Sequence, residues 1–292
     1  MAKAKIILKR RKSVRNTEKI TRTMEMVSTA KYKQSHSRIA NSAPYQEKLR
    51  ELMAGLGGAG ESVSHPLLES RPVKRSVVLL ITSNRGLCGG YNSNLISRAV
   101  DVLREEEGAG IRTDLHVIGT KGISFFRYRN RELAAAHDDF DDKSGYAQVN
   151  RIAGDFLRLY TEGEVDRVTV IYQKFLSAGR QSPVAEVLLP LSAVTETEPG
   201  EEADSAGTDY LYSPDPESIL RELLPAYFRT TLYNDYLQAV VGEHLARMVA
   251  MKNATEAAEK LIKSLTGMYN RARQSQITNE IAELMGGVEA LK

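Results

Sequence analysis

The two ends of the chain combine helical spacing of apolar residues with a lack of proline. Residues 1–43 and 226–292 contain none of the nine prolines. Proline costs about 3 kcal/mol inside a helix, so these ends predict two long helices. Toward the C-terminus, apolar or small residues recur every three or four positions, as in a coiled coil: Leu237, Val241, Leu245, Met248, Met251, Thr255, Ala258, Ile262, Leu265 and Tyr269.

The C-terminal stretch is too long to be covered by a domain of this size. Its residues 226–292 would extend about 100 Å at ~1.5 Å per residue. Near the N-terminus, Ile20, Met24 and Val27 fit one shorter stripe, which Lys31 and Gln34 continue. Because the two ends leave the middle of the chain in opposite directions, we predict that they pair as an antiparallel coiled coil.

The middle of the chain alternates strand-like and helix-like stretches. The predicted strands are 76–82, 115–119, 167–172 and 184–189, and the predicted helices are 92–107 and 146–162. This alternation is typical of a small Rossmann-like α/β domain with a parallel sheet. The predicted fold class is therefore α/β, with a long antiparallel coiled coil of the N- and C-terminal helices. The expected layout is 1–58 N-terminal helix, 73–192 α/β domain, 193–213 acidic linker and 214–288 C-terminal helix.

Charge is distributed unevenly along the chain. Residues 1–50 hold 14 Lys and Arg against three acids, whereas the whole chain has a net charge of only +3. Such a basic segment favours an acidic partner, which could be nucleic acid, anionic lipid or an acidic protein surface. The alternative is a solvated helix face.

The best candidate for chemistry is the turn Ser83–Gly90, which lies between a predicted strand and a predicted helix. Glycine-rich turns at this place can hold phosphate on backbone N–H groups. The spacing here fits neither GxGxxG nor GxxxxGK[ST], and no His or acid lies near Cys88 in sequence. We therefore favour a structural or docking turn over a nucleotide site or a nucleophile.

Other classes of site are not indicated. The single cysteine allows no disulfide framework, and the five histidines form no metal-binding pattern. No run of 18 apolar residues predicts a membrane span, and the N-terminus lacks the apolar core of a secretory signal. The expectation is a non-catalytic protein without metal or cofactor that stays in the compartment where it is made.

Several segments resemble the gamma subunit of the rotary (F-type) ATP synthase, bacterial type. The resemblance rests on residues 13–27, 86–92, 210–216, 246–255, 269–274 and 277–283. The sequence differs from the family pattern at Ser213, where the family often has an acid, and at Val288, where the family has alanine.

The resemblance implies a central-stalk rotor subunit that transmits torque between a membrane rotor ring of c subunits and a catalytic ring of alpha and beta subunits. It would couple proton flow to ATP synthesis and regulate ATPase activity. The implied contacts with the catalytic ring are Met24, Arg10, Arg11, Arg15, Arg247, Lys252, Arg273, Gln274, Thr278 and Glu280. The implied contacts with the epsilon subunit and the rotor ring are Gly86, Leu87, Cys88, Tyr210, Tyr212 and Ser213.

The resemblance also implies a location on the cytoplasmic face of the cell inner membrane, with membrane contact only through the complex and no nucleic-acid partner.

Two other classes of function remain open at this point. A nucleic-acid-binding protein would use the basic N-terminal helix on phosphate, although aromatic residues make up only 7% of the chain. A nucleotide-binding α/β enzyme would need a working glycine-rich turn.

Overall fold

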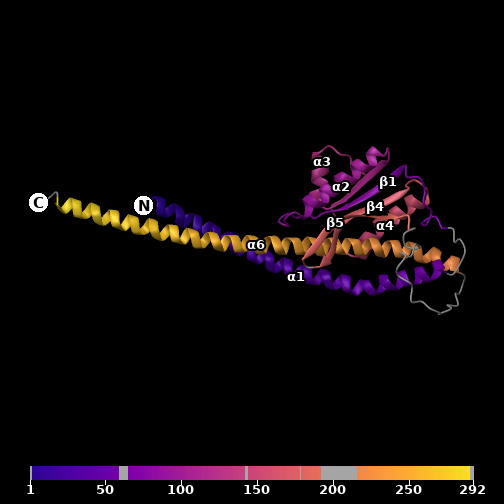
Figure 1. Ribbon diagram of the computed structural model, residues 1–292, viewed down its shortest axis with the longest axis horizontal. Helices are drawn as coiled ribbons and strands as arrows, with labels where there is room; N and C mark the ends of the chain where they lie inside the picture. Colours follow the sequence, from indigo (N-terminus) through magenta and orange to yellow (C-terminus); the bar gives the residue numbers. More distant parts are fainter. Residues whose placement is uncertain (1, 59–64, 142–143, 178, 192–215, 290–292) are drawn as a thin grey trace. The chain divides into compact units, whose positions relative to one another are not determined.

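The computed structural model describes residues 2–58, 65–141, 144–177, 179–191 and 216–289. Two very long helices, α1 (Ala2–Gly58) and α6 (Pro216–Glu289), form the two ends of the chain, and the strands and shorter helices lie between them in sequence (Figure 1). The chain divides into two compact units. Residues 1–30 and 247–292 form the helix-pair unit, and residues 31–246 form the sheet unit. The two long helices contribute residues to both.

The sheet unit is built on five strands in the order β3-β2-β1-β4-β5. The first four strands in this order are parallel, and β5 runs antiparallel to β4 at one edge. The strands are β1 (Arg75–Ile81), β2 (Arg112–Ile118), β3 (Ala135–His137), β4 (Arg167–Ser177) and β5 (Arg180–Leu189). The helices between them are α2 (Tyr91–Gly108), α3 (Thr120–Tyr128) and α4 (Tyr146–Thr161).

Both faces of the sheet are covered, as the continuous apolar run in β1 predicts. Successive side chains of a strand point to opposite faces. Val78 and Leu80 accordingly pack with buried residues of α2 and α3, whereas Val77 and Leu79 pack with α4 and α6. All four of these side chains are at most 1% exposed.

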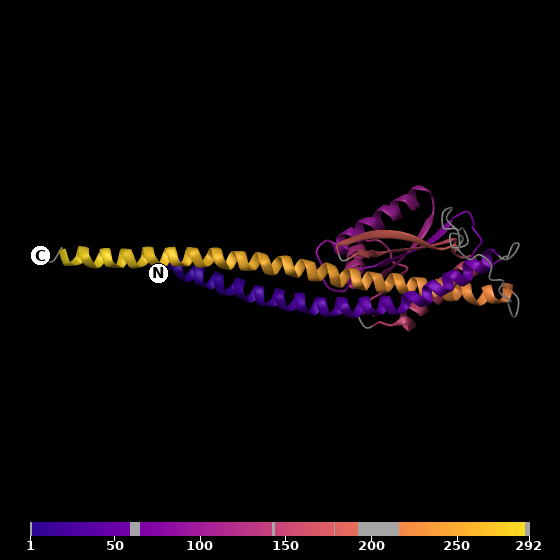
Figure 2. The ribbon, with the colours of Figure 1, turned by 60° about the horizontal axis from the view of Figure 1, so that its bottom comes forward.

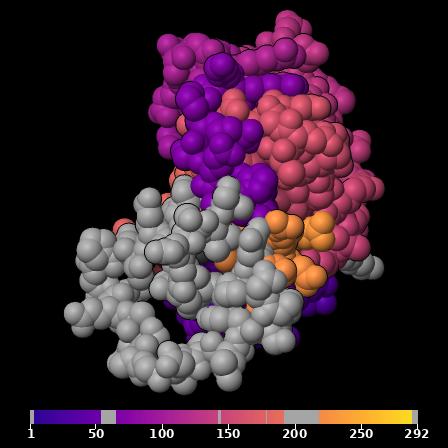
Figure 3. Space-filling view, turned by 90° about the vertical axis from the view of Figure 1, so that its right-hand side faces the viewer, coloured from indigo at the N-terminus to yellow at the C-terminus, as the bar shows by residue number. Residues whose placement is uncertain are grey.

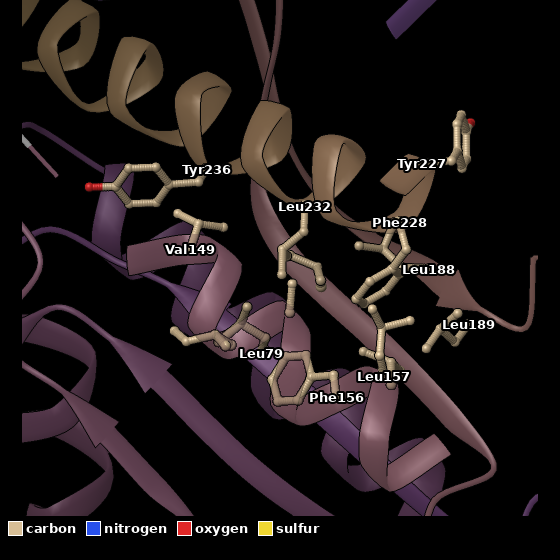
Figure 4. Packing of buried hydrophobic residues seen from close by; sticks show 14 of the residues in the cluster. Leu79, Val149, Phe156, Leu157, Leu188, Leu189, Tyr227, Phe228, Leu232 and Tyr236 are labelled. Carbon is tan, nitrogen blue, oxygen red and sulfur yellow. The ribbon is translucent and has the colours of Figure 1, made fainter. Parts of the chain in front are cut away.

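The N-terminal part of α6 belongs to this core. Figure 4 shows Phe228 and Leu232 pointing from α6 toward Leu188 of β5 and toward Phe156 of α4. Phe228 and Phe156 are both 0% exposed. In the space-filling view, the first turns of α6, in orange, reach the surface beside pink residues of the sheet region (Figure 3). The start of α6 is thus fixed by apolar packing against the sheet unit.

The two long helices are also paired in the helix-pair unit, where they run side by side (Figure 2). Arg11 lies over the ring of Tyr269, and Thr21 is hydrogen-bonded to Thr255. Arg22 is paired with Glu259. Contacts that move forward along α1 therefore move backward along α6, which confirms the predicted antiparallel arrangement.

The predicted apolar stripe near the N-terminus is wrong. Ile20 and Val27 are 60% and 51% exposed. The buried positions are instead Thr21 and Ser28, at 8% and 3% exposed. The Thr21 hydroxyl group donates to the Glu18 carbonyl oxygen and accepts from Thr255 across the pair, so a polar side chain is satisfied at this buried position.

The predicted α/β fold is confirmed, although the short α3 and β3 were not expected. Pro44 and Pro225 lie inside α1 and α6. The proline-free stretches 1–43 and 226–292 are thus shorter than the helices, whereas the expected spans 1–58 and 214–288 include both prolines. Both helices continue because buried residues lie on the far side of each proline, including Leu49 and Leu220. Tertiary packing there outweighs the cost of proline.

Gly119 was predicted as the end of a strand but is a turn residue after β2. Its φ is +96°, and an added Cβ would lie 2.2 Å from the carbonyl oxygen of Thr82. Only glycine fits this close approach. The resulting turn starts α3 directly after β2.

None of the helices in the described part of the chain has the length and apolar character required to cross a membrane.

Candidate functional site

The turn after β1 is closed by its own side chains. The Asn92 carboxamide oxygen accepts hydrogen bonds from the Ser83 backbone N–H (3.1 Å) and hydroxyl (3.0 Å), and its nitrogen donates to the Cys88 sulfur at 3.2 Å. Cys88 is 2% exposed. These contacts use the Ser83 N–H and the polar side chains of the turn within the protein, so the geometry favours the structural or docking interpretation.

Leu87 is the large apolar side chain that this turn presents to solvent. It is 60% exposed, and its φ of +64° is unusual for a residue other than glycine. A bulky apolar side chain held outward in a left-handed conformation is a costly arrangement that the surrounding hydrogen bonds maintain. Of the predicted contacts Gly86, Leu87 and Cys88, the exposed apolar side chain is therefore Leu87.

The turn also anchors the next βα connection. The Asn84 carboxamide oxygen accepts hydrogen bonds from the backbone N–H of Thr120 (3.0 Å) and from its hydroxyl (3.1 Å). The amide nitrogen of Asn84 donates to the carbonyl oxygen of Phe140. These bonds tie the loops after β1, β2 and β3 into one edge of the sheet and hold the Leu87 turn in place.

The predicted contacts of the N-terminal helix fall into two groups. Arg10 and Arg15 are exposed. Arg11 is half-buried, with its guanidinium 5.2 Å from the Tyr269 ring centre, and Met24 is half-buried. Arg10 and Arg15 thus present charge to solvent, whereas Arg11 and Met24 also take part in the helix pair.

The predicted contacts of the C-terminal helix differ in the same way. Arg247 is only 7% exposed, whereas Lys252 is exposed. Arg273, Gln274, Thr278 and Glu280 are all exposed. Within this stretch, Thr278 donates to the Gln274 carbonyl oxygen (3.0 Å) and Glu280 accepts from Gln276 (2.8 Å). These bonds stay within the helix, so the outer faces of these side chains remain open.

The last turns of α6 expose an apolar face that the sequence reasoning missed. Every residue from 277 to 287 is exposed. By helical spacing, the apolar residues among them share one side of the helix with Gln274 and Thr278: Ile277 (44% exposed), Ile281 (52%), Leu284 (71%) and Met285 (69%). The signal was available, because Ile277, Ile281, Leu284 and Met285 are themselves spaced by three and four residues.

Tyr210, Tyr212 and Ser213 lie outside the described residues. In the part of the chain that is described, no group of three or more His, Cys, Asp or Glu side chains could hold a metal ion.

Comparison with known proteins identifies the family. The family model "ATP synthase" matches residues 3–291. The ATP synthase gamma chain of Rhodopirellula baltica is 43% identical over 300 residues, and that of Leptospira biflexa is 41% identical over 292 residues. Both alignments cover 100% of each chain.

Solved structures share the fold. A chain in the Euglena gracilis mitochondrial ATP synthase (OSCP/F1/c-ring, rotational state 3) matches with a TM-score of 0.66 at 18% identity, covering 99% of this chain and 95% of that chain. A chain of the Tetrahymena thermophila mitochondrial ATP synthase central stalk and c-ring matches with a TM-score of 0.55 at 22% identity, covering 80% and 99%. The full-length family match and the two relatives above 40% identity show that this chain belongs to the ATP synthase gamma chain family.

Proposed function

We propose that this chain is the central-stalk rotor subunit of a proton-translocating ATP synthase, a non-catalytic shaft between a membrane ring of c subunits and a catalytic ring of alpha and beta subunits. The observation that carries the proposal is the exposed apolar face at the end of α6. Ile281, Leu284 and Met285 are each more than half exposed. An uncovered apolar face on a helix is typical of a protein contact, and a surrounding ring would cover it.

The exposed charges of the helix-pair unit suit an acidic partner. Arg10 and Arg15 on α1 and Lys252 on α6 are exposed in the helix-pair unit. Charges of this kind steer a partner and set its orientation more than they add affinity. We expect them to face carboxylates of the beta subunits, with Met24, Arg11 and Arg247 supporting the same surface from more buried positions.

Torque transmission then needs no chemistry in this chain. The helix pair differs from side to side, with apolar residues on one side of the end of α6 and polar residues such as Asn279 and Glu283 on the other. A surrounding subunit that meets the apolar side in one orientation and the polar side in another experiences different binding free energies. Rotation would thereby shift each beta subunit among its nucleotide-binding states.

The Leu87 turn is our candidate for the opposite attachment. With Gly86 and Cys88 it forms a rigid edge that presents one apolar side chain. We propose that this edge, together with Tyr210, Tyr212 and Ser213, contacts the epsilon subunit and the rotor ring. The subunit would then lie at the cytoplasmic face of the membrane and reach the bilayer only through the complex.

The test compares two substitutions that add the same charge to opposite sides of α6. Leu284→Asp places a carboxylate on the apolar face, and Asn279→Asp places one on the polar side. Both positions are exposed, so neither change should unfold the chain. The variants are assembled into the complete enzyme in membrane vesicles, and ATP hydrolysis and ATP-driven proton pumping are measured together.

We expect Leu284→Asp to lower the ratio of pumping to hydrolysis and Asn279→Asp to leave it near the wild-type value. Equal ratios in all three enzymes would contradict the proposed contact. Failure of the wild-type chain to co-purify with alpha and beta subunits would contradict the proposed function as a whole.

A further inference from the structure

A buried carboxyl group lies between α6 and the sheet, away from every surface discussed above. Asp235 of α6 is 3% exposed, and its Oδ2 atom has no hydrogen-bond partner. A buried carboxylate normally requires a cation or several donors, because removing an unpaired charge from water costs several kcal/mol. Neither is present at this oxygen, so the surroundings favour the neutral acid.

The hydrogen bonds of Tyr172 lead to the same protonation state. Its hydroxyl group donates to Glu186 Oε2 at 2.8 Å and also interacts with Asp235. A phenol has a single hydrogen, so a Tyr172 that donates to Glu186 has none left for Asp235. Toward Asp235 its hydroxyl oxygen can act only as an acceptor, which favours the protonated carboxyl group.

The chain of groups reaches the surface. Glu186 of β5 lies 3.6 Å from the ammonium group of Lys174 of β4, and both side chains are about two-fifths exposed, at 40% and 42%. The order from the interior outward is therefore Asp235, Tyr172, Glu186 and Lys174. If Tyr172 passes its proton to Glu186 and takes the proton of Asp235, one proton leaves the interior and Asp235 becomes a carboxylate.

The other charged and titratable neighbours do not neutralise a buried carboxylate. Burial first, and the charge of Glu186 second, raise the pKa of Asp235 well above its ordinary value, while the charge of Lys174 acts in the opposite direction. Tyr227, also on α6, has its pKa raised, chiefly by burial. The charge of Arg50 of α1 lowers this pKa, whereas the charges of Glu186 and Asp235 raise it. Burial also raises the pKa of Tyr172.

We propose that Asp235 is a proton-dependent latch: its protonated carboxyl group holds α6 against β4 and β5, and loss of the proton loosens this contact. The latch concerns the attachment of α6 within the sheet unit and does not depend on the rotary role. It would make the anchorage of α6 to the sheet sensitive to alkaline pH.

The sign of the effect follows from linkage. A carboxyl group whose pKa is raised by folding stabilises the native state most below its ordinary pKa of about 3.9. This contribution decreases as pH rises through the pKa of the folded protein. Asp235→Asn keeps the shape and the hydrogen-bond donor but cannot ionise, so it should match the wild type in acid and exceed it in alkali.

Infrared spectroscopy of the full chain tests the protonation state directly. At neutral pH the exposed carboxyl groups are ionised, so the C=O stretch of a protonated acid should be present in the wild type and missing in Asp235→Asn. Tyr172→Phe removes the acceptor and should shift this band to higher frequency. A wild-type spectrum without a band that the Asn substitution removes would overturn the proposal.

Thermal unfolding of the same proteins tests the latch. The midpoint of Asp235→Asn should exceed that of the wild type by about 2–4 °C at about pH 8, and the difference should vanish toward about pH 4. Asp166→Asn is the matched control with opposite sign. Although burial alone would raise the pKa of Asp166, backbone N–H groups of Lys74 and Arg75 hold it below its ordinary value.

Asp166→Asn should therefore be less stable than the wild type at alkaline pH. An Asp235→Asn midpoint that is equal to or below the wild-type value across the whole alkaline range would overturn the latch. Hydrogen exchange gives the local readout, because amides of α6 between residues 219 and 246 should exchange faster in the wild type than in Asp235→Asn at the same alkaline pH.

Discussion

One helix, α6, has two different environments in the two units. In the sheet unit, residues such as Leu224, Phe228 and Leu232 are at most 1% exposed and pack into the apolar core. In the helix-pair unit, the buried line narrows to isolated positions such as Thr255 and Leu265, and all residues from 277 to 287 are exposed. The comparison shows that a single element can be an anchor over part of its length and a contact surface over the rest.

The electrostatics of the two units differ as well. All five histidines lie in the sheet unit. The helix-pair unit contains none, and its ion pairs, such as Arg22 with Glu259, are on the surface with side chains 53% and 47% exposed. Acid should therefore act mainly on the sheet unit, and salt mainly on the helix pair.

The strongest test of the difference between the two parts of α6 is to truncate one apolar residue in each part. Phe228→Ala should lower the free energy of unfolding by about 3–5 kcal/mol, because it leaves a cavity in the core. Leu284→Ala should change it by less than about 0.5 kcal/mol, because the side chain is already in water. Chemical denaturation of both variants checks the contrast, and similar losses would refute it.

A second prediction concerns acid. His116 of β2 is stacked on His137 of β3 and packs edge-on against Phe156. Burial first, and the neighbouring His137 second, lower the pKa of His116 to about 4. A pKa lowered by folding means that stability is complete above about pH 6.5 and decreases as pH falls toward about 4, by about 3 kcal/mol in total.

His116→Gln, which cannot be protonated in this range, should flatten that part of the stability profile. Unfolding of the wild type and the variant at a series of pH values between about 7 and 4 gives the measurement. Parallel profiles for the two proteins would show that His116 is not the group that titrates.

Removing the hydrogen bond between Thr21 and Thr255 in the helix pair should have a smaller effect on stability. Thr255 Oγ1 lies 2.8 Å from Thr21 Oγ1, and both residues are buried. Thr21→Val and Thr255→Val should each destabilise the pair by about 1 kcal/mol, and the double variant should lose less than the sum, with a coupling of about 0.5–1 kcal/mol. Zero coupling in the double-mutant cycle would show that the hydrogen bond between Thr21 and Thr255 does not contribute to stability.

The smallest effect is expected for the surface ion pairs. Arg22 also pairs with Glu18 at 3.0 Å, with side chains 53% and 14% exposed. Arg22→Ala should cost about 0–1 kcal/mol, and the loss should decrease with added salt. A larger loss that does not change between low and high salt would mean that Arg22 contributes by packing instead.

The sequence predicted the strands of the sheet because their apolar runs are continuous. β1 and β4 are buried on both faces, so no amphipathic alternation obscured them. β3 has only three residues and α3 only nine. Segments this short do not show the two-residue period of a strand or the 3.6-residue period of a helix. The absence of proline alone would have ended the helices at Pro44 and Pro225, because it does not include the packing of Leu49 or Leu220 beyond them.

The contact residues could be predicted only in part. Charge and family resemblance indicated Arg10, Arg15 and Lys252, which are exposed. They did not indicate that Arg247 would be nearly buried or that Cys88 would point inward, because both depend on neighbours distant in sequence. The buried Asp235 gave no signal at all, since one acid in a helix of mixed character is indistinguishable from a solvated one until its burial is known.

The Ser and Thr line of the helix pair has a consequence for the life of the subunit before assembly. Thr21 and Ser28 bury little apolar area, so the paired helices gain little from each other and their ends should open readily in the unassembled chain. Proteases cleave such transiently opened segments. A copy outside the complex should thus be cleaved more readily than one that has been incorporated.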